Sequence, residues 1–246
     1  MATKLLYLDS FDVKVCTATI QTVDVMDDER IQVTLDQTCF YPRGGGQDWD
    51  TGTIRAQDAV LKVEEVRLDP EGIVQHIGAL ESGDLQSGAA VECRVDGPRR
   101  DINTRLHSAG HVVDMAVQKL GYGWRPGRGA HYPHMSFVEY SGELAPEQYD
   151  DVRAAIQSEV DNIVAEGGDS EIRFMPVEQM HTVCAYVPEN IPTNKPARVV
   201  IYNGTFGCPC GGTHVSNIRQ IGKVTISKLK SKKGVIKVSY AAAGIN

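Results

Sequence analysis

The sequence has no long apolar run, and this absence sets the first limits on its function. No stretch approaches the roughly 18–20 apolar residues that a helix needs to cross a bilayer. The N-terminal segment MATKLLYLDSFDVK also lacks the extended apolar core and small-residue cleavage site of a signal peptide. We therefore expect a cytoplasmic protein with no membrane partner.

Cysteine is too sparse for a disulfide scaffold, with six among 246 residues. Such cysteines in a reducing compartment are usually buried thiols or metal ligands. Cys16, Cys39 and Cys93 lie in strand-like stretches, where we expect buried packing. The segment CPCGGTH, Cys208 to His214, leaves three alternatives open: a structural zinc site, a catalytic metal site, or a tight turn with an incidental thiol.

The chain also lacks a basic excess, because 25 Lys and Arg face 32 Asp and Glu for a net charge of -7. This balance argues against a generic nucleic-acid binder. The phosphate-binding pattern GxxxxGK[ST] is absent as well. Two local clusters are exceptions that could contact phosphates or be solvated loop charges. They are Lys228, Lys230, Lys232, Lys233 and Lys237 in KLKSKKGVIK, and Arg99, Arg100 and Arg105 in PRRDINTR.

Residues 1–96 read as short strands separated by Asp, Gly and Ser clusters. Regular short strands with this punctuation predict a small β-barrel, with a sandwich as the alternative. Residues 97–246 are predicted to form an α+β domain with two main helices and an antiparallel sheet, which makes the whole chain α+β.

Two helices stand out in the second domain. Apolar residues spaced i, i+3, i+4 predict a helix over 101–120, with Asp101 as the N-cap and Gly121 as the stop. A second helix is predicted from Pro146 to the terminator Gly167-Gly168.

Two short motifs carry residues that bind metals. His107 and His111 are four residues apart on the first helix, which places both imidazoles on one face. Cys210 and His214 flank a Gly-Gly-Thr turn that could let them converge on one ion. Each motif alone is weak, and two boundary histidines remain the alternative for the first. Together the four side chains make a donor set suited to zinc.

These motifs resemble the editing domain of alanyl-tRNA synthetases, and most closely their free-standing AlaX-type relatives. The resemblance rests on HSAGH, CGGTHV and IGKVTI, and on CFYPRGGGQDWDTG, which is similar to the family's FYPxGGGQxxDxG segment. CGGTHV is the most specific of them, since the related threonyl-tRNA editing domains generally differ between the Cys and the His.

The resemblance implies a hydrolase that acts in trans on mischarged tRNA(Ala). The expected substrates are Ser-tRNA(Ala) and Gly-tRNA(Ala), and the expected cofactor is Zn²⁺ held by His107, His111, Cys210 and His214. Cys210 is also predicted as a catalytic residue. Two other readings stay open, a non-catalytic tRNA-binding module with a structural zinc and a zinc hydrolase of another ester. The sequence does not predict the oligomeric state.

The sequence departs from the family at two places near the second histidine. Gly110 stands where many members have Thr, and we expect this substrate-binding position to affect selectivity and enlarge the pocket. The Gln that synthetase-type domains carry downstream is missing from GWRPGRGAH. Arg125, Arg128 or His131 could replace it or bind the tRNA terminus, although His131 is more readily assigned to a loop.

The glycine-rich segment of the first domain supplies the remaining candidates. Gly44, Gly45 and Gly46 are predicted to bind substrate, with a plain β-turn as the alternative. Gln47 is predicted as a catalytic residue whose amide contacts the ester or the adenosine. Cys208 is assigned to packing, and Asp114 to a charged helix face.

Overall fold

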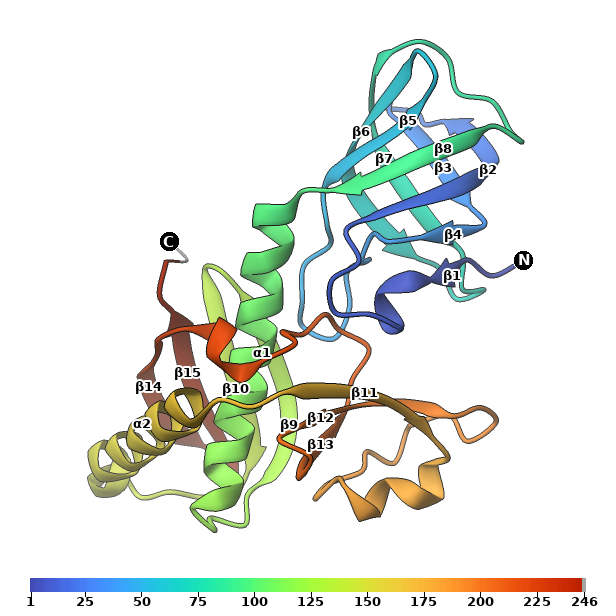
Figure 1. Ribbon diagram of the computed structural model, residues 1–246. Coiled ribbons are helices and arrows are strands. Elements are labelled where there is room, and N and C mark those ends of the chain that lie inside the picture. The colour runs from blue at the N-terminus through green and yellow to red at the C-terminus, as the bar shows by residue number, and fades with distance from the viewer. Residues whose placement is uncertain (245–246) are drawn as a thin grey trace. The chain divides into compact units, whose positions relative to one another are not determined.

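The computed structural model describes residues 1–244, which form two compact units (Figure 1). The barrel unit contains residues 1–44 and 48–101. The site unit contains residues 45–47 and the chain from Ile102 onward. Within the described residues, no helix combines the length and apolar character needed to cross a membrane.

Six antiparallel strands close the barrel in the order β2-β3-β7-β6-β5-β8. Inward side chains alternate along each strand, as β6 shows with Ala59, Leu61 and Val63 in the core. The predicted barrel is therefore confirmed. Its strands are β2 (Val15–Val25), β3 (Ile31–Leu35), β5 (Gly52–Ala56), β6 (Ala59–Leu68), β7 (Val74–Ser82) and β8 (Ala90–Val95), beside the short parallel pair β1 (Lys4–Leu5) and β4 (Gln37–Thr38) and the 3-10 turn Leu6–Leu8.

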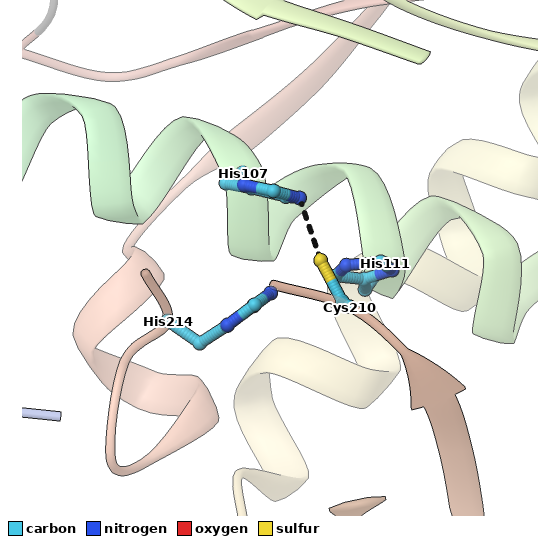
Figure 2. A group of neighbouring side chains, drawn as sticks. All are labelled: His107, His111, Cys210 and His214. Carbon is cyan, nitrogen blue, oxygen red and sulfur yellow. Dashed lines mark hydrogen bonds between the residues drawn. The ribbon is translucent and has the colours of Figure 1, made fainter. Parts of the chain in front are cut away.

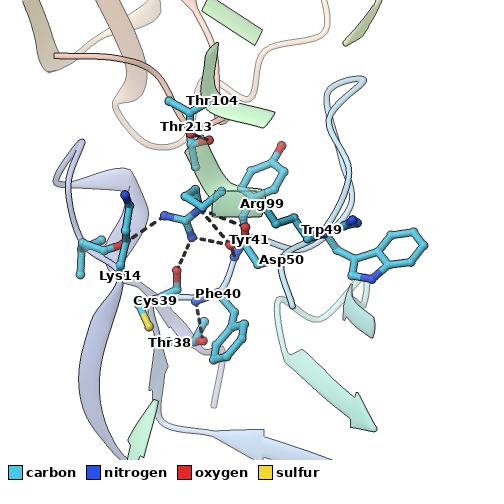
Figure 3. A network of polar contacts seen from close by, with 12 residues as sticks. Lys14, Thr38, Cys39, Phe40, Tyr41, Trp49, Asp50, Arg99, Thr104 and Thr213 are labelled. Carbon is cyan, nitrogen blue, oxygen red and sulfur yellow. Dashed lines mark hydrogen bonds and ion pairs between the residues drawn. The ribbon is translucent and has the colours of Figure 1, made fainter. Parts of the chain in front are cut away.

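A buried ion pair between Arg100 and Asp50 closes the loop that follows β4. The two side chains are 2% and 0% exposed. The Asp50 carboxylate accepts hydrogen bonds from Arg100 Nε at 3.0 Å and from the Tyr41 N–H at 2.7 Å (Figure 3). The guanidinium also donates to the carbonyls of Val13 and Cys39, at 3.1 and 2.7 Å. Every charged atom of the pair thus has a partner, which is what a buried ion pair requires.

The sequence left two roles open for the arginines of PRRDINTR, phosphate contact and solvated loop charge, and the structure shows internal hydrogen bonds for all three. Arg100 is buried on Asp50, and Arg105 donates to the carbonyls of Ile221 and Ala243. Arg99 donates to the Trp49 carbonyl at 2.9 Å. All three arginines therefore bind the protein's own oxygen atoms.

The first helix, α1 (Gly97–Lys119), begins four residues before the predicted start. The Asp96 carboxylate accepts a hydrogen bond from the Arg99 N–H at 3.1 Å, so Asp96 acts as the N-cap in place of Asp101. Pro98 is compatible with this start, because the first turn of a helix needs no N–H from it. Gly121, with φ +70°, follows the helix as predicted.

The site unit contains two antiparallel sheets and two main helices, which confirms the α+β class. The four-stranded sheet has the order β14-β15-β10-β9 and the three-stranded sheet β11-β12-β13. Helix α2 packs on β14, where the Gln157 amide bonds the backbone of Val224 and Ile226. The elements are β9 (Arg125–Tyr132), β10 (Met135–Ser141), α2 (Tyr149–Glu166), β11 (Ser170–Met175), β12 (Ala197–Tyr202), β13 (Phe206–Pro209), β14 (Val224–Lys232) and β15 (Val235–Ala242), with 3-10 turns at Pro146–Gln148, Val177–Thr182 and Ile218–Ile221.

We expect Asp50→Asn to lower the free energy of unfolding by about 3–5 kcal/mol, because it leaves the buried Arg100 guanidinium without a counter-charge. Urea unfolding followed by Trp49 fluorescence in a Trp124→Phe background measures the effect within the barrel unit.

The matched control is Asp28→Asn, which removes a carboxylate from an exposed pair with Arg30. Exposed pairs contribute little, so the control should unfold at nearly the wild-type urea concentration. Equal midpoints for the two variants would contradict the structural role of the buried pair.

Candidate metal centre

Helix α1 supplies two imidazoles on one face. The ring centres of His107 and His111 lie 5.2 Å apart with 24° between the ring planes, as a spacing of four residues predicts. Both side chains are buried, at 2% and 7% exposure. The helix therefore holds two nitrogen donors at a fixed separation and away from bulk water.

The other two donors come from the turn that follows β13. Arg198, on the neighbouring β12, donates to the carbonyls of Cys210 and Gly212 at 2.6 and 3.1 Å, and this fixes the turn. Gly212 has to be glycine, since a Cβ there would lie 2.2 Å from His107 Cε1. The turn then directs Cys210 and His214 toward the helix (Figure 2).

The four side chains form one cluster, shown in Figure 2. Their ligand atoms all lie within 4.8 Å of one another, and Cys210 Sγ is 3.3 Å from His107 Nε2. The cluster joins positions about a hundred residues apart and could hold a metal ion. Cys208 lies outside the cluster, on β13.

Unpartnered nitrogens test whether a metal fits these residues. Both ring nitrogens of His111 and both of His214 are buried without a hydrogen-bond partner among residues 1–244. Burying such groups unpaired costs free energy, and nearly all buried polar atoms in proteins have a partner. A cation with a preference for nitrogen and sulfur donors would supply a partner to one nitrogen of each ring. The residues present therefore fit a metal ion.

The protonation of three of the four side chains also fits a metal ion; for His111, burial acts to lower the pKa, but Cys208, Tyr202 and Asp114 together raise it well above its usual range. Burial holds the pKa of His107 and of His214 well below the usual range, so both imidazoles are neutral, the form that binds metals. Burial acts to raise the pKa of the Cys210 thiol, but His111, the Gly212 N–H and Arg198 together bring that pKa below its usual value. Burial raises the pKa of Cys208 instead, which disfavours its thiolate.

Gln47 lies behind His107 and is 0% exposed. Its Oε1 accepts hydrogen bonds from His107 Nδ1 at 2.8 Å and from the Thr213 N–H at 3.1 Å. Its Nε2 donates to the Thr213 hydroxyl at 2.9 Å, and that hydroxyl lies 2.7 Å from the hydroxyl of Thr104 (Figure 3). With Nδ1 donating, the lone pair of His107 Nε2 faces Cys210. This geometry favours an orienting role for Gln47 over the predicted contact with the ester.

The three glycines before Gln47 have different surroundings. Gly46, at φ +76°, packs so closely on β9 that a Cβ would lie 2.5 Å from the Gly129 carbonyl oxygen, and its own carbonyl accepts the His131 N–H at 2.8 Å. Gly45 lines the cavity described below. Gly44 lies in the barrel unit, where the Tyr41 hydroxyl donates to its carbonyl.

Gly110 is buried against a neighbouring ring. A Cβ at this position would lie 2.5 Å from His131 Cε1 and 2.9 Å from the Tyr240 hydroxyl. The space next to Gly110 is therefore filled, and the expected enlargement of the pocket at this point is wrong. The Tyr240 hydroxyl donates to the Leu106 carbonyl at 3.0 Å, so His131 Nδ1 donates to Tyr240.

His131 is the site residue that the sequence placed least well. It lies on β9 instead of in a loop, and its ring stacks on that of His107 with centres 4.5 Å apart. Burial lowers the pKa of His131 to about 3, so the ring is neutral. Asp114 also lies beside the cluster, with a carboxylate oxygen 3.5 Å from His111 Nδ1 and another accepting from the Tyr140 hydroxyl at 2.6 Å.

A cavity of about 880 Å³ reaches the cluster at His107, His111 and Cys210. Its walls come from α1, β9, β10, β13 and the segment 185–188, and include the aromatic rings of Trp124, Tyr186 and Phe206. Of the predicted substrate-binding residues, Gly45, Gly46, Arg125 and Arg128 line the cavity.

Arg125 connects two walls of this cavity. Its guanidinium donates to the Tyr186 hydroxyl and to Glu189, both at 3.1 Å. The Arg128 guanidinium carbon lies 5.6 Å from the Phe137 ring centre. The aromatic wall residues were not singled out from the sequence, where nothing distinguishes a ring lining a cavity from a ring in the core.

Comparisons with known proteins match both units. Residues 5–99 match the family model for class II (A) tRNA synthetases, and residues 197–237 match the second additional domain of threonyl and alanyl tRNA synthetases. The alanyl-tRNA editing protein AlaX-L of Pyrococcus horikoshii is 27% identical over 95% of this chain and 55% of its own length.

Alanine–tRNA ligases are similar over most of the chain as well. The enzyme of Trichodesmium erythraeum is 30% identical over 84% of this chain, and that of Methanopyrus kandleri 31% over 85%. The chain spans 23% of the length of each of these ligases. It is thus a relative of the AlaX-type alanyl-tRNA editing proteins and of the editing region of alanine–tRNA ligases, as its motifs indicate.

Proposed function

We propose that this chain is a zinc-dependent deacylase that hydrolyses the aminoacyl ester of mischarged tRNA(Ala), with Ser-tRNA(Ala) and Gly-tRNA(Ala) as substrates. The observation that carries the proposal is the cluster of His107, His111, Cys210 and His214 at the end of a cavity. The similarity to an alanyl-tRNA editing protein supports the substrate class.

Three imidazoles and one thiolate are a donor set typical of zinc. When bound, zinc supplies Lewis acidity and lowers the pKa of water to about 7, and both effects favour ester hydrolysis at neutral pH. The chain's own contribution is to hold the donors. The Gly212 N–H, 3.4 Å from Cys210 Sγ, favours the thiolate, and Gln47 keeps Nε2 of His107 unprotonated.

The cavity provides for the aminoacyl end of the tRNA. Its volume of about 880 Å³ lies within the range of sites that enclose small molecules. Of the four candidate metal ligands, His107, His111 and Cys210 line the cavity wall. His214 does not line it. Trp124 and Tyr186 are aromatic wall residues beside which the terminal adenine can stack, next to the Tyr122 ring that stacks on Trp124 and the Arg125 guanidinium that lies over Tyr186. The ester can then meet the candidate metal centre at the wall of the cavity.

We expect the metal-loaded protein to deacylate Ser-tRNA(Ala) and Gly-tRNA(Ala) and to spare Ala-tRNA(Ala). Removing the metal with a chelator should abolish hydrolysis, and one equivalent of Zn²⁺ should restore it. His111→Ala and Cys210→Ser should each lower kcat at least 100-fold and reduce the bound zinc, because each removes a donor.

Cys184→Ser is the matched control, since it changes a thiol that lies outside the cluster and does not line the cavity. Zinc content and kcat should stay near those of the wild-type protein. A metal-loaded protein that hydrolyses none of the three aminoacyl-tRNAs would refute the deacylase. If such a protein still bound tRNA and one zinc, it would instead be a binding module with a structural metal.

A second prediction separates the two possible roles of Gln47. Gln47→Ala leaves His107 Nδ1 and the Thr213 groups without their partner, so we expect zinc affinity to fall about 10–100-fold. At saturating zinc the KM for Ser-tRNA(Ala) should be unchanged. Competition with a chromophoric chelator measures the affinity, and steady-state deacylation measures KM.

Direct contact between Gln47 and the ester predicts the opposite pair of results, an unchanged zinc affinity and a raised KM. Gln118→Ala serves as the control, because Gln118 is an amide side chain on α1 that lines the cavity and lies outside the cluster. Its zinc affinity should match that of the wild-type protein.

A further inference from the structure

The four-stranded sheet has a second face, opposite the one that packs on α1 and α2. On the packed side, Ile226, Leu229, Val238 and Tyr240 are buried. Because side chains alternate along a strand, the residues between them point the other way. On this opposite side, which we call the lysine face, lie the exposed Lys228, Lys230 and Lys232, the partly exposed Lys237 and Ser239, and the buried ring of Phe137.

The strand register arranges the lysine face in rows. Lys228 lies opposite Ser239, which lies opposite Phe137 on β10. In the next row Lys230 lies opposite Lys237. The successive lysines of β14 are two residues apart, or about 6.7 Å, a distance comparable with that between successive phosphates of a nucleic-acid strand.

Few negative charges balance these lysines. Among the described residues, Lys228, Lys230 and Lys232 form no ion pair, and the pair that Lys237 forms with Glu139 is long, at 3.9 Å. Lys230 and Lys237 are also like charges directly opposite each other, an arrangement that destabilises a sheet. The chain as a whole carries a net charge of -7, so the lysine face differs in sign from the rest of the protein.

The lysine face is hollowed and partly aromatic. A groove of about 550 Å³ is lined by Lys228, Lys230, Lys237 and His134. Its floor includes Phe137, whose ring centre lies 3.2 Å from Lys237 Nζ. Met135, at the margin, is 43% exposed. The groove thus combines cations with an apolar floor, which matches a ribose-phosphate backbone better than a small isolated anion.

We propose that the lysine face binds the phosphate backbone of the acceptor arm of the tRNA whose aminoacyl end occupies the cavity. This inference rests on the proposed function for the identity of the RNA. Strand β9 is the edge of the same sheet and lines the cavity, and it lies three strand spacings, or about 14 Å, from β14. A single-stranded 3′ end can cover this distance past the glycines of β9, Gly127 and Gly129.

An anionic membrane is the other polyanion that a lysine cluster can attract. Interfacial binding usually relies on an amphipathic helix or on several protruding apolar side chains. The lysine face is instead a sheet surface with its cations in rows along a groove. These features favour RNA, and the membrane becomes an outcome of the test.

The experiment compares the double variant Lys228→Gln/Lys230→Gln with Lys4→Gln/Lys62→Gln, which removes two exposed charges from the barrel unit. The probe is deacylated tRNA(Ala), so binding is measured without hydrolysis. We expect the first variant to raise Kd at least 10-fold at 0.15 M salt. The slope of log K against log salt should become shallower by about 2, one phosphate contact for each lysine lost.

Zinc content and the kcat at saturating Ser-tRNA(Ala) should be unchanged in the first variant, and the control should bind like wild type. If the Lys228→Gln/Lys230→Gln variant has the wild-type Kd and salt slope, or if both variants lose the same affinity for tRNA(Ala), the assignment is overturned. It is also overturned if the first variant still binds tRNA(Ala) but no longer binds phosphatidylserine vesicles. The proposed function can fail separately. If the wild-type protein hydrolyses no aminoacyl-tRNA but the Lys228→Gln/Lys230→Gln variant raises the Kd for tRNA(Ala), the deacylase is refuted and the lysine face still binds tRNA.

Discussion

The site depends on three buried imidazoles and one partly buried thiol that meet at a single point. Both ring nitrogens of His111 and of His214 have no hydrogen-bond partner within residues 1–244, and a metal ion would pair with one nitrogen of each ring and so reduce the cost of burying them. Several surrounding features serve this arrangement. Arg198 fixes the turn, Gly212 allows the close approach of His107, and Gln47 sets its tautomer.

Much of this arrangement could be predicted from the sequence, namely the parts that depend only on residues close together in the chain. A spacing of four residues places His107 and His111 on one helix face whatever the rest of the chain does. Regular short strands separated by Asp, Gly and Ser clusters likewise predicted the barrel, with a sandwich as the alternative. No local pattern predicts that His111 and Cys210 meet, because they lie about a hundred residues apart. The resemblance to the editing family indicated that they do.

The errors have a common physical origin, since they concern residues whose environment comes from distant segments. At Gly110 the sequence indicated a missing Thr hydroxyl and a larger pocket, but His131 from β9 and Tyr240 from β15 fill that space. Arg100 reads as a surface charge, but it is buried on Asp50. In both cases a side chain far away in the sequence determines what the residue contacts.

The two faces of the four-stranded sheet have different chemistry because strand side chains alternate. One face carries Tyr240 and His131 toward the metal centre, and the other carries the lysine rows. Substitutions at successive positions of β14 and β15 can therefore alter one face and leave the other intact. The proposed binding of a polyanion and the proposed placement of an ester therefore depend on different side chains.

X-ray absorption at the zinc edge on the protein as purified tests the metal centre most directly. The account predicts one zinc per chain with a single sulfur ligand and the remaining protein ligands nitrogen, and loss of the sulfur signal in Cys210→Ser. Two sulfur ligands would place Cys208 in the site, and a protein that takes up no zinc would contradict the central claim.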